Sequence, residues 1–150
     1  MDILNLIEAD HQKIAELFQK LQKTKGAAQN RQQLFTKIKE EFTLHAQAEE
    51  LVFYPALQAT DEAQDMVLNA QADHQLIAEL FEEIASDADQ DTDWDEKLNE
   101  LQENVEGHVE EEEDELFDMA RQLLSTEQAR KLAEEWQRVK QEQQMAKISP

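Results

Sequence analysis

Two histidines in the chain are each followed, four residues later, by a glutamate. His45 precedes Glu49 in the segment HAQAE, and His108 precedes Glu112 in the segment HVEEE. On a helix, residues four apart are rotated by only about 40° and separated by about 6 Å along the axis, so both side chains can reach one point beside the helix. Imidazole nitrogens and carboxylate oxygens at such a point are ligands for a divalent metal ion. The two pairs therefore indicate metal binding.

An internal repeat connects these pairs with the two remaining histidines. The segment DHQKIAELF begins at Asp10, and DHQLIAELF begins 63 residues later at Asp73. His11 and His74 are the second residues of these segments, and the same shift superimposes the two histidine–glutamate pairs. A duplicated helical hairpin explains the repeat, because one hairpin cannot bury its own apolar face, whereas two hairpins form a four-helix bundle.

The pattern of caps and breaks predicts five helices. They are expected at about residues 2–23, 28–57, 61–84, 93–123 and 125–146. An Asp2 cap begins the first helix and Gly26 follows it, the acidic stretch SDADQDTD precedes the fourth, and Ser125 with Gln128 forms a capping box before the fifth. The predicted fold is all-α, an up-down-up-down four-helix bundle with an additional C-terminal helix. Residues 1–150 are expected to form a single domain of two hairpins, about 2–57 and 61–123, and the C-terminal helix.

Each histidine lies within an apolar stripe of three- and four-residue spacing, so we expect all four imidazoles to point into the core. Glu49 and Glu112 share these stripes. Counting the rise per residue along each helix from the short loops places the six side chains at about the same level of the bundle. Two carboxylates buried in an apolar core are costly unless a cation compensates them, and no lysine or arginine lies on the nearby stripes.

Four imidazoles and two carboxylates are too many ligands for one tetrahedral zinc ion. Two ions fit better. If Glu49 and Glu112 each bridged the pair, every ion would have two imidazole nitrogens and two carboxylate oxygens. Coordination positions would remain open for water, oxide, oxygen or peroxide. On the residues alone this shell suits iron, manganese, zinc or copper.

Four successive helices carry, in order, a histidine, an HxxxE motif, a histidine and an HxxxE motif. This order resembles the hemerythrin-like family of cation-binding (HHE) domains. The segments HAQAEELVFYP and HVEEEEDELFD carry the match, which extends over nearly the whole chain. The resemblance implies a non-haem di-iron centre, in which an oxo or hydroxo group could bridge two iron ions, with manganese or zinc less favoured. It implies dioxygen binding at an open iron position. The implied terminal ligands are His11, His45, His74 and His108, with Glu49 and Glu112 as bridges.

The oxygen-carrying members of that family use five histidines, whereas this chain has four. Glu8, Glu41, Glu115 or a water molecule could complete the shell. A more open site favours ligand exchange, oxidation and peroxide chemistry over reversible oxygen carriage.

Two further expectations concern residues beside the ligands. Tyr54, next to the ligands of the second helix, could relay electrons or hydrogen-bond a bound peroxide, but on a regular helix it would lie about 140° around the axis from Glu49, which disfavours this role. In the acidic run EEEEDE only Glu112 has ligand spacing. Solvent exposure is expected for Glu110, Glu111 and Glu113.

The bulk composition excludes several classes of function. With 35 acidic and 14 basic residues the net charge is −21, which repels phosphate backbones and anionic lipid headgroups. We therefore expect no nucleic-acid partner and no membrane partner, and protein partners are left open. The absence of cysteine excludes thiolate ligands. Because no signal peptide or membrane span is recognisable, a cytoplasmic location is expected.

These features favour a binding protein, in which a di-iron centre captures dioxygen, nitric oxide, peroxide or iron itself for sensing, scavenging or storage. The alternative is an enzyme. The same centre would then decompose hydrogen peroxide, as a catalase or peroxidase does, or oxidise ferrous iron, with Glu49 or Glu112 shifting to admit the substrate. A third interpretation, a metal-free interaction bundle, requires the two carboxylates to be exposed.

Overall fold

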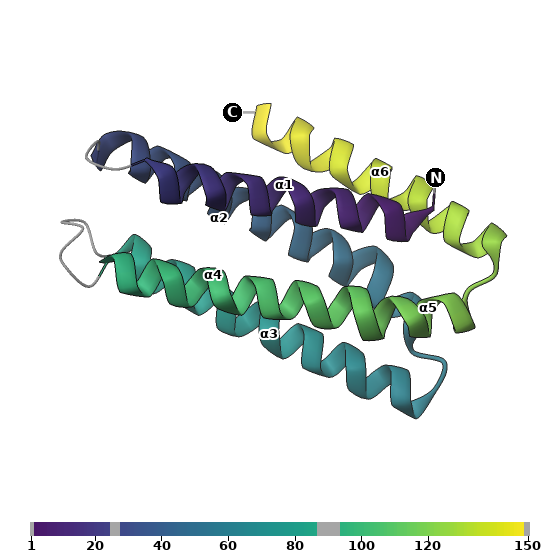
Figure 1. The fold of residues 1–150 in the computed structure, drawn as a ribbon. Helices are drawn as coiled ribbons and strands as arrows, with labels where there is room; N and C mark the ends of the chain where they lie inside the picture. Colours follow the sequence, from purple (N-terminus) through teal and green to yellow (C-terminus); the bar gives the residue numbers. More distant parts are fainter. Residues whose placement is uncertain (1, 25–27, 87–93, 149–150) are drawn as a thin grey trace.

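The computed structural model describes residues 2–24, 28–86 and 94–148, and within these ranges the chain is helical and contains no strand (Figure 1). Gly26 and most of the acidic stretch, residues 87–93, lie outside the described residues. The elements in chain order are α1 (Ile3–Lys23), α2 (Ala28–Ala48), the π-helical turn η1 (Glu49–Phe53), the 3₁₀ turn η2 (Tyr54–Leu57), α3 (Asp61–Ala85), α4 (Trp94–Glu111), the π-helical turn η3 (Glu112–Leu116), α5 (Phe117–Leu123) and α6 (Thr126–Ile148).

The predicted four-helix bundle is confirmed. Helix α1 packs against α2 and α3 packs against α4, while contacts of α2 with α3 and of α1 with α4 close the bundle. The predicted second helix corresponds to α2, η1 and η2, and the predicted fourth helix to α4, η3 and α5. Both are continuous rods in which the helical type changes at the glutamate of the HxxxE pair (Figure 1).

Side-chain caps begin the helices where the sequence places them. Asp2 accepts a hydrogen bond from the backbone N–H of Asn5, whose side chain accepts one from Asp2 in return. The capping box before α6 is also confirmed, because Ser125 and Gln128 exchange the same pair of bonds at 2.8 and 3.1 Å. Each cap is worth about 1 kcal/mol, which is enough to define where the helix starts.

The core consists of two apolar clusters with the histidines between them. Along α1, Ile3 to Ile7 belong to the first cluster and Ile14 to Leu21 to the second, and His11 lies at the boundary. In the other three rods of the bundle the histidine also separates the two clusters, and in α2 and α4 the second cluster comes first along the chain. The histidine layer therefore has apolar packing above and below it. Bulk water is therefore kept away from the layer along the bundle axis.

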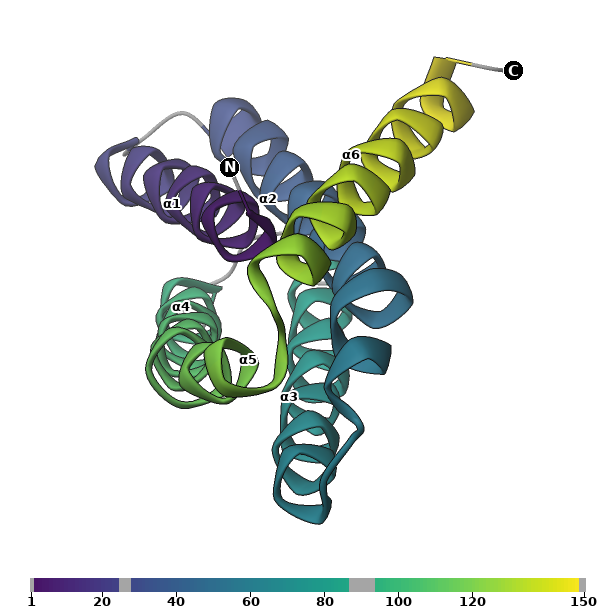
Figure 2. The ribbon, with the colours of Figure 1, turned by 90° about the vertical axis from the view of Figure 1, so that its right-hand side faces the viewer.

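Helix α6 lies on α1 and α2 and leaves α3 and α4 on the far side of the bundle (Figure 2). The ring of its Trp136 meets the ring of His45 edge-on, with centroids 5.6 Å apart. Lys140 places its Nζ 2.7 Å from a carboxylate oxygen of Asp10. The fifth helix thus covers one of the two grooves that the duplication creates.

Candidate metal centre

The structure brings the six predicted side chains together. Each is at most 5% exposed, so all lie in the interior. Their ligand atoms form two groups, and within each group every atom lies within 4.8 Å of the others. The groups are His11, His45, Glu49 and Glu112, and His74, His108, Glu49 and Glu112. Both carboxylates belong to both groups, which is the geometry that two bridged ions require.

The atoms that face the middle of the centre are short of hydrogen-bond partners. Within the described part of the chain, no hydrogen bond of good geometry reaches Nε2 of His11, His45 or His108, Oε2 of Glu49 or Oε1 of Glu112. The contacts that these atoms make are ion pairs within the centre: Nε2 of His11 lies 3.2 Å from Oε1 of Glu112, and Nε2 of His45 lies 3.0 Å from Oε1 of Glu49. Buried polar atoms of this kind cost about 1–3 kcal/mol each when unsatisfied. Cations in the two groups would satisfy them, and the donor set of imidazole nitrogens and carboxylate oxygens fits iron.

Carboxylates hold the outer nitrogens of two imidazoles. Oδ2 of Asp10 lies 2.9 Å from Nδ1 of His45, and Oδ2 of Asp73 lies 3.1 Å from Nδ1 of His108. The two aspartates are related by the same 63-residue shift as the histidines. A carboxylate on Nδ1 fixes the tautomer that presents Nε2 to a metal and increases the basicity of the ring.

Glu113 plays the corresponding part for His11, and the expectation that it faces only solvent is wrong. Its Oε2 lies 2.6 Å from Nδ1 of His11, while its side chain stays 31% exposed. The reason is that α1 packs close enough to α4 for a long side chain at the rim to reach across. Its repeat mate Glu50 is exposed, and Nδ1 of His74 has no hydrogen-bond partner among the described residues.

Tyr54 is the main residue that the sequence analysis placed wrongly. Its buried hydroxyl donates a hydrogen bond to Oε2 of Glu112 at 2.7 Å. The hydroxyl oxygen of Tyr54 also lies 3.2 Å from Nε2 of His74 and 3.4 Å from Oε1 of Glu49. Instead of facing away, the phenol is in contact with both shared carboxylates.

The π-helical turn η1 accounts for this position. The backbone N–H of Tyr54 bonds to the carbonyl of Glu49, five residues earlier, where an α-helix would bond four residues back. The wider turn brings Tyr54 around to the side of the helix that Glu49 occupies. In the second repeat η3 does the same for Phe117, whose N–H bonds to the carbonyl of Glu112.

At this position the two repeats therefore differ by one hydroxyl group. Phe117 is the repeat mate of Tyr54 and stacks on His11, with ring centroids 6.5 Å apart and planes within 13°. The ring of Tyr54 lies 5.5 Å from that of His74. An aromatic wall is thus present beside both groups, but only the group of His74 and His108 has a phenol.

The residues considered as substitutes for a fifth histidine lie farther out. Glu8 is exposed, and Glu41 places its Oε1 3.3 Å from Nζ of Lys13. Glu115 is exposed at the edge of a cavity that also touches Glu112. None of the three belongs to either ligand group.

Electrostatic interactions give the two shared carboxylates different pKa values. Burial would raise the pKa of Glu49, but the charge of His45, whose Nε2 lies 3.0 Å from Oε1 of Glu49, outweighs it and holds that pKa well below the usual value. Burial and the negative charge of Glu49 raise the pKa of Glu112 to about 7. Burial would lower the pKa of His11, but Glu112 and Glu113 raise it to about 10. Burial and the charges of both glutamates raise the pKa of Tyr54 far above its usual value.

This buried layer of histidines and glutamates on a helical bundle defines a metal-binding domain, and comparison with known families agrees. The chain belongs to the hemerythrin HHE cation binding domain family, whose match covers residues 2–120.

Two individual proteins are similar to it. A "DNA nickase" from Nostoc sp. (strain PCC 7120) is 31% identical over 146 residues, which are 93% of this chain and 39% of that protein. This chain therefore spans well under half of that relative's length. A solved structure of a hemerythrin HHE cation binding domain-containing protein from Mycobacterium kansasii superimposes with a TM-score of 0.84 at 20% identity, covering 94% of this chain and 86% of the other. That likeness establishes the shared fold.

In the part of the chain that the structure describes, no helix combines the length and apolar character needed to span a bilayer.

The raised pKa of His11 predicts that metal binding releases protons. With a pKa of about 10 the imidazole is protonated at pH 7, and Glu112, with a pKa of about 7, is partly protonated. Metal ions bind the deprotonated ligands, so they must displace these protons, and apparent affinity should rise with pH from about 6 to 8. Titration of the apoprotein with Mn²⁺, followed by calorimetry in buffers of different ionisation enthalpy, should show at least one proton released per chain at pH 7. Metal binding that releases no protons and does not depend on pH would contradict the assignment of His11 and Glu112 as metal ligands.

Proposed function

We propose that this protein holds two iron ions between its helices and uses them to bind dioxygen or a related small ligand, in oxygen or nitric oxide sensing, scavenging or iron storage. The observation that carries the proposal is the sharing of Glu49 and Glu112 by two buried four-ligand groups. Four imidazoles would serve as terminal ligands, two for each ion. Two bridging carboxylates hold ions at the short separation of about 3.5–4 Å that is typical of two-metal sites.

Bound iron would supply exchangeable coordination positions and one-electron chemistry, and the protein residues determine how these are used. Asp10, Asp73 and Glu113 orient three of the imidazoles through Nδ1. We propose that Tyr54 supplies the additional oxygen donor in place of a fifth histidine, because its hydroxyl is in contact with both carboxylates and with His74. The apolar clusters on either side limit access of water.

The charge of the chain supports a proposal about partners as well. A net charge of −21 disfavours contact with a phosphate backbone, so we propose that DNA is not a partner of this chain. The name of the Nostoc relative describes a longer protein, of which the aligned residues form 39%. A cytoplasmic location remains part of the same proposal.

Iron content and its dependence on the shared carboxylates test the main proposal. Protein purified after growth with iron should contain about two irons per chain. Its absorption spectrum should change reversibly with dioxygen. Glu49→Ala and Glu112→Ala should each lose most of the iron, because removing one shared carboxylate takes a ligand from both ions. Glu110→Ala is the matched control, since this exposed glutamate belongs to the same acidic run but to neither ligand group. A wild-type protein without iron, or equal iron in all variants, would overturn the proposal.

Decomposition of hydrogen peroxide is a second candidate, and the position of Tyr54 favours it. A phenol in contact with both shared carboxylates can donate a proton and an electron inside the centre. If the protein is such an enzyme, Tyr54→Phe should lower the rate of oxygen evolution from peroxide by roughly 100-fold, the size expected for loss of a proton-donating group. Phe117 at the equivalent position shows that a phenylalanine fits this part of the fold. An unchanged rate in the variant, measured at equal iron content, would exclude this role of Tyr54.

A further inference from the structure

The duplication creates two equivalent grooves, and the structure treats them differently. The groove between α1 and α2 is covered by α6, whose Trp136 lies against His45. The equivalent groove between α3 and α4 has no helix on it within the described part of the chain (Figure 2). The second hairpin therefore exposes a surface that the first hairpin buries.

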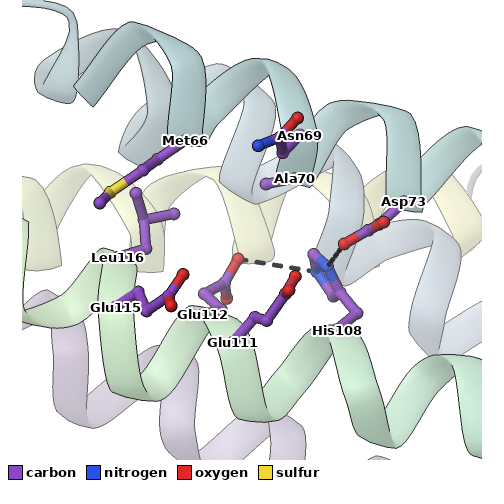
Figure 3. Close-up of a pocket in the computed structure, with 9 residues that line it drawn as sticks. All are labelled: Met66, Asn69, Ala70, Asp73, His108, Glu111, Glu112, Glu115 and Leu116. Carbon is purple, nitrogen blue, oxygen red and sulfur yellow. Dashed lines mark hydrogen bonds and ion pairs between the residues drawn. The ribbon is translucent and has the colours of Figure 1, made fainter. Parts of the chain in front are cut away.

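A cavity of about 60 Å³ lies in the uncovered groove and reaches the metal centre (Figure 3). It is bounded by the shared carboxylate of Glu112 and by His108, together with Asp73, Glu111 and Glu115. The side chains of Glu111, Glu112 and Glu115 all extend from the α4–η3 rod towards α3 (Figure 3). A volume of this size holds water molecules, because one water needs only about 10–15 Å³ of such space.

The repeat shows that the acidic lining distinguishes this groove from the equivalent groove between α1 and α2. Shifting by 63 residues places Glu111 on Ala48 and Glu115 on Val52, and both of these apolar residues are buried in the cluster under α6. The remaining carboxylate of the cavity, Asp73, corresponds to Asp10, whose charge is balanced by Lys140 of α6. In the covered groove the equivalent positions are thus apolar or neutralised. In the open groove they are the exposed carboxylates of Glu111 and Glu115 and the half-buried carboxylate of Asp73.

Buried atoms at the floor of the cavity point to a cation as its occupant. Nε2 of His108 and Oε1 of Glu112 are buried and make no hydrogen bond of good geometry among the described residues. Nε2 of His108 lies 3.7 Å from Oε2 of Glu112, and Oε1 of Glu112 lies 3.2 Å from Nε2 of His11, so these atoms contact only other groups of the centre. Both side chains are more than nine-tenths buried. A positive ion attracted by the outer carboxylates would therefore meet unsatisfied ligand atoms immediately inside.

Cavities beside the other histidines offer a poorer path for a cation. The cavity between α1 and α4 touches His11 and also has acidic side chains in its lining, among them Glu106 and Glu110. Glu113 nevertheless occupies the Nδ1 side of the His11 ring, and no shared carboxylate lines the space. The cavity between α2 and α3 touches His74 and is lined mainly by apolar side chains and glutamines. The groove between α3 and α4 differs from both because Glu112 itself forms part of its wall.

We propose that divalent metal ions reach the centre through the groove between α3 and α4, where Glu111 and Glu115 hold the incoming hydrated cation before Glu112 and His108 take it up. The inference rests on the proposed function, because it requires the inner residues to bind metal. Glu111 and Glu115 belong to neither ligand group, so they act on the passage of the ion and not on its final coordination.

The rate of metal uptake tests this route separately from the capacity of the centre. Co²⁺ is mixed with the full-length apoprotein in a stopped-flow instrument, and its visible absorption reports binding to nitrogen and oxygen ligands. The double variant Glu111→Gln/Glu115→Gln should take up Co²⁺ roughly tenfold more slowly, because local carboxylates raise the association rate of a cation. The final amount of bound metal should not change. Uptake by the wild type should slow as salt is added, and uptake by the variant should depend on salt much less.

Glu96→Gln/Glu100→Gln is the matched control. These two glutamates are also exposed and lie four residues apart on α4, but they are distant from the cavity along the helix. Their substitution removes the same amount of charge as the substitution of Glu111 and Glu115. The control should take up metal at the wild-type rate. Equal rates in the two double variants, or a lower final metal content in Glu111→Gln/Glu115→Gln, would overturn the route. A wild-type protein that binds no Co²⁺ would overturn the proposed function, and the route with it.

Discussion

The structure depends on a pair of carboxylates buried where water cannot solvate them. Glu49 and Glu112 lie between two apolar clusters, and the groups around them are imidazoles and one phenol. Burial and the negative charge of Glu49 raise the pKa of Glu112, while the charge of His45 keeps Glu49 ionised. Cations shared by both carboxylates would convert this unfavourable burial into a favourable interaction. Metal binding and folding stability should therefore be linked, because the ions bind the folded arrangement and have no such site in the unfolded chain.

The two ligand groups are related by duplication but are not chemically equivalent. The group of His11 and His45 is closed by Glu113, by Phe117 and by the Trp136 side of α6. The group of His74 and His108 has Tyr54 as a neighbour and an open, acidic groove beside it. With two ions bound as proposed, such an arrangement would favour one well-protected ion and one that exchanges ligands. The asymmetry arises from a few substitutions on a duplicated frame together with the position of a single added helix.

Much of this architecture could be predicted from residue spacing, because inward-facing polar groups on apolar stripes constrain both the helices and their packing. The position of Tyr54 could not be predicted on the assumption that every turn is α-helical. A signal was nevertheless present in the sequence, where apolar residues continue each HxxxE pair at intervals of four: His45, Glu49, Phe53 and Leu57 in one rod, and His108, Glu112, Leu116 and Ala120 in the other. Such spacing exceeds the 3.6 residues of an α-helical turn and indicates a wider turn. The contact of Glu113 with His11 depends on the distance between α1 and α4, which no pattern within one helix reveals.

The central claim is that six side chains from four helical rods share two metal ions, and a crystal structure of the iron-loaded protein with anomalous scattering at the iron edge tests it most directly. The account predicts two anomalous peaks about 3.5–4 Å apart. One peak should lie beside His11 and His45 and the other beside His74 and His108, with Glu49 and Glu112 in contact with both. A single peak, or peaks bound only by surface carboxylates, would contradict it.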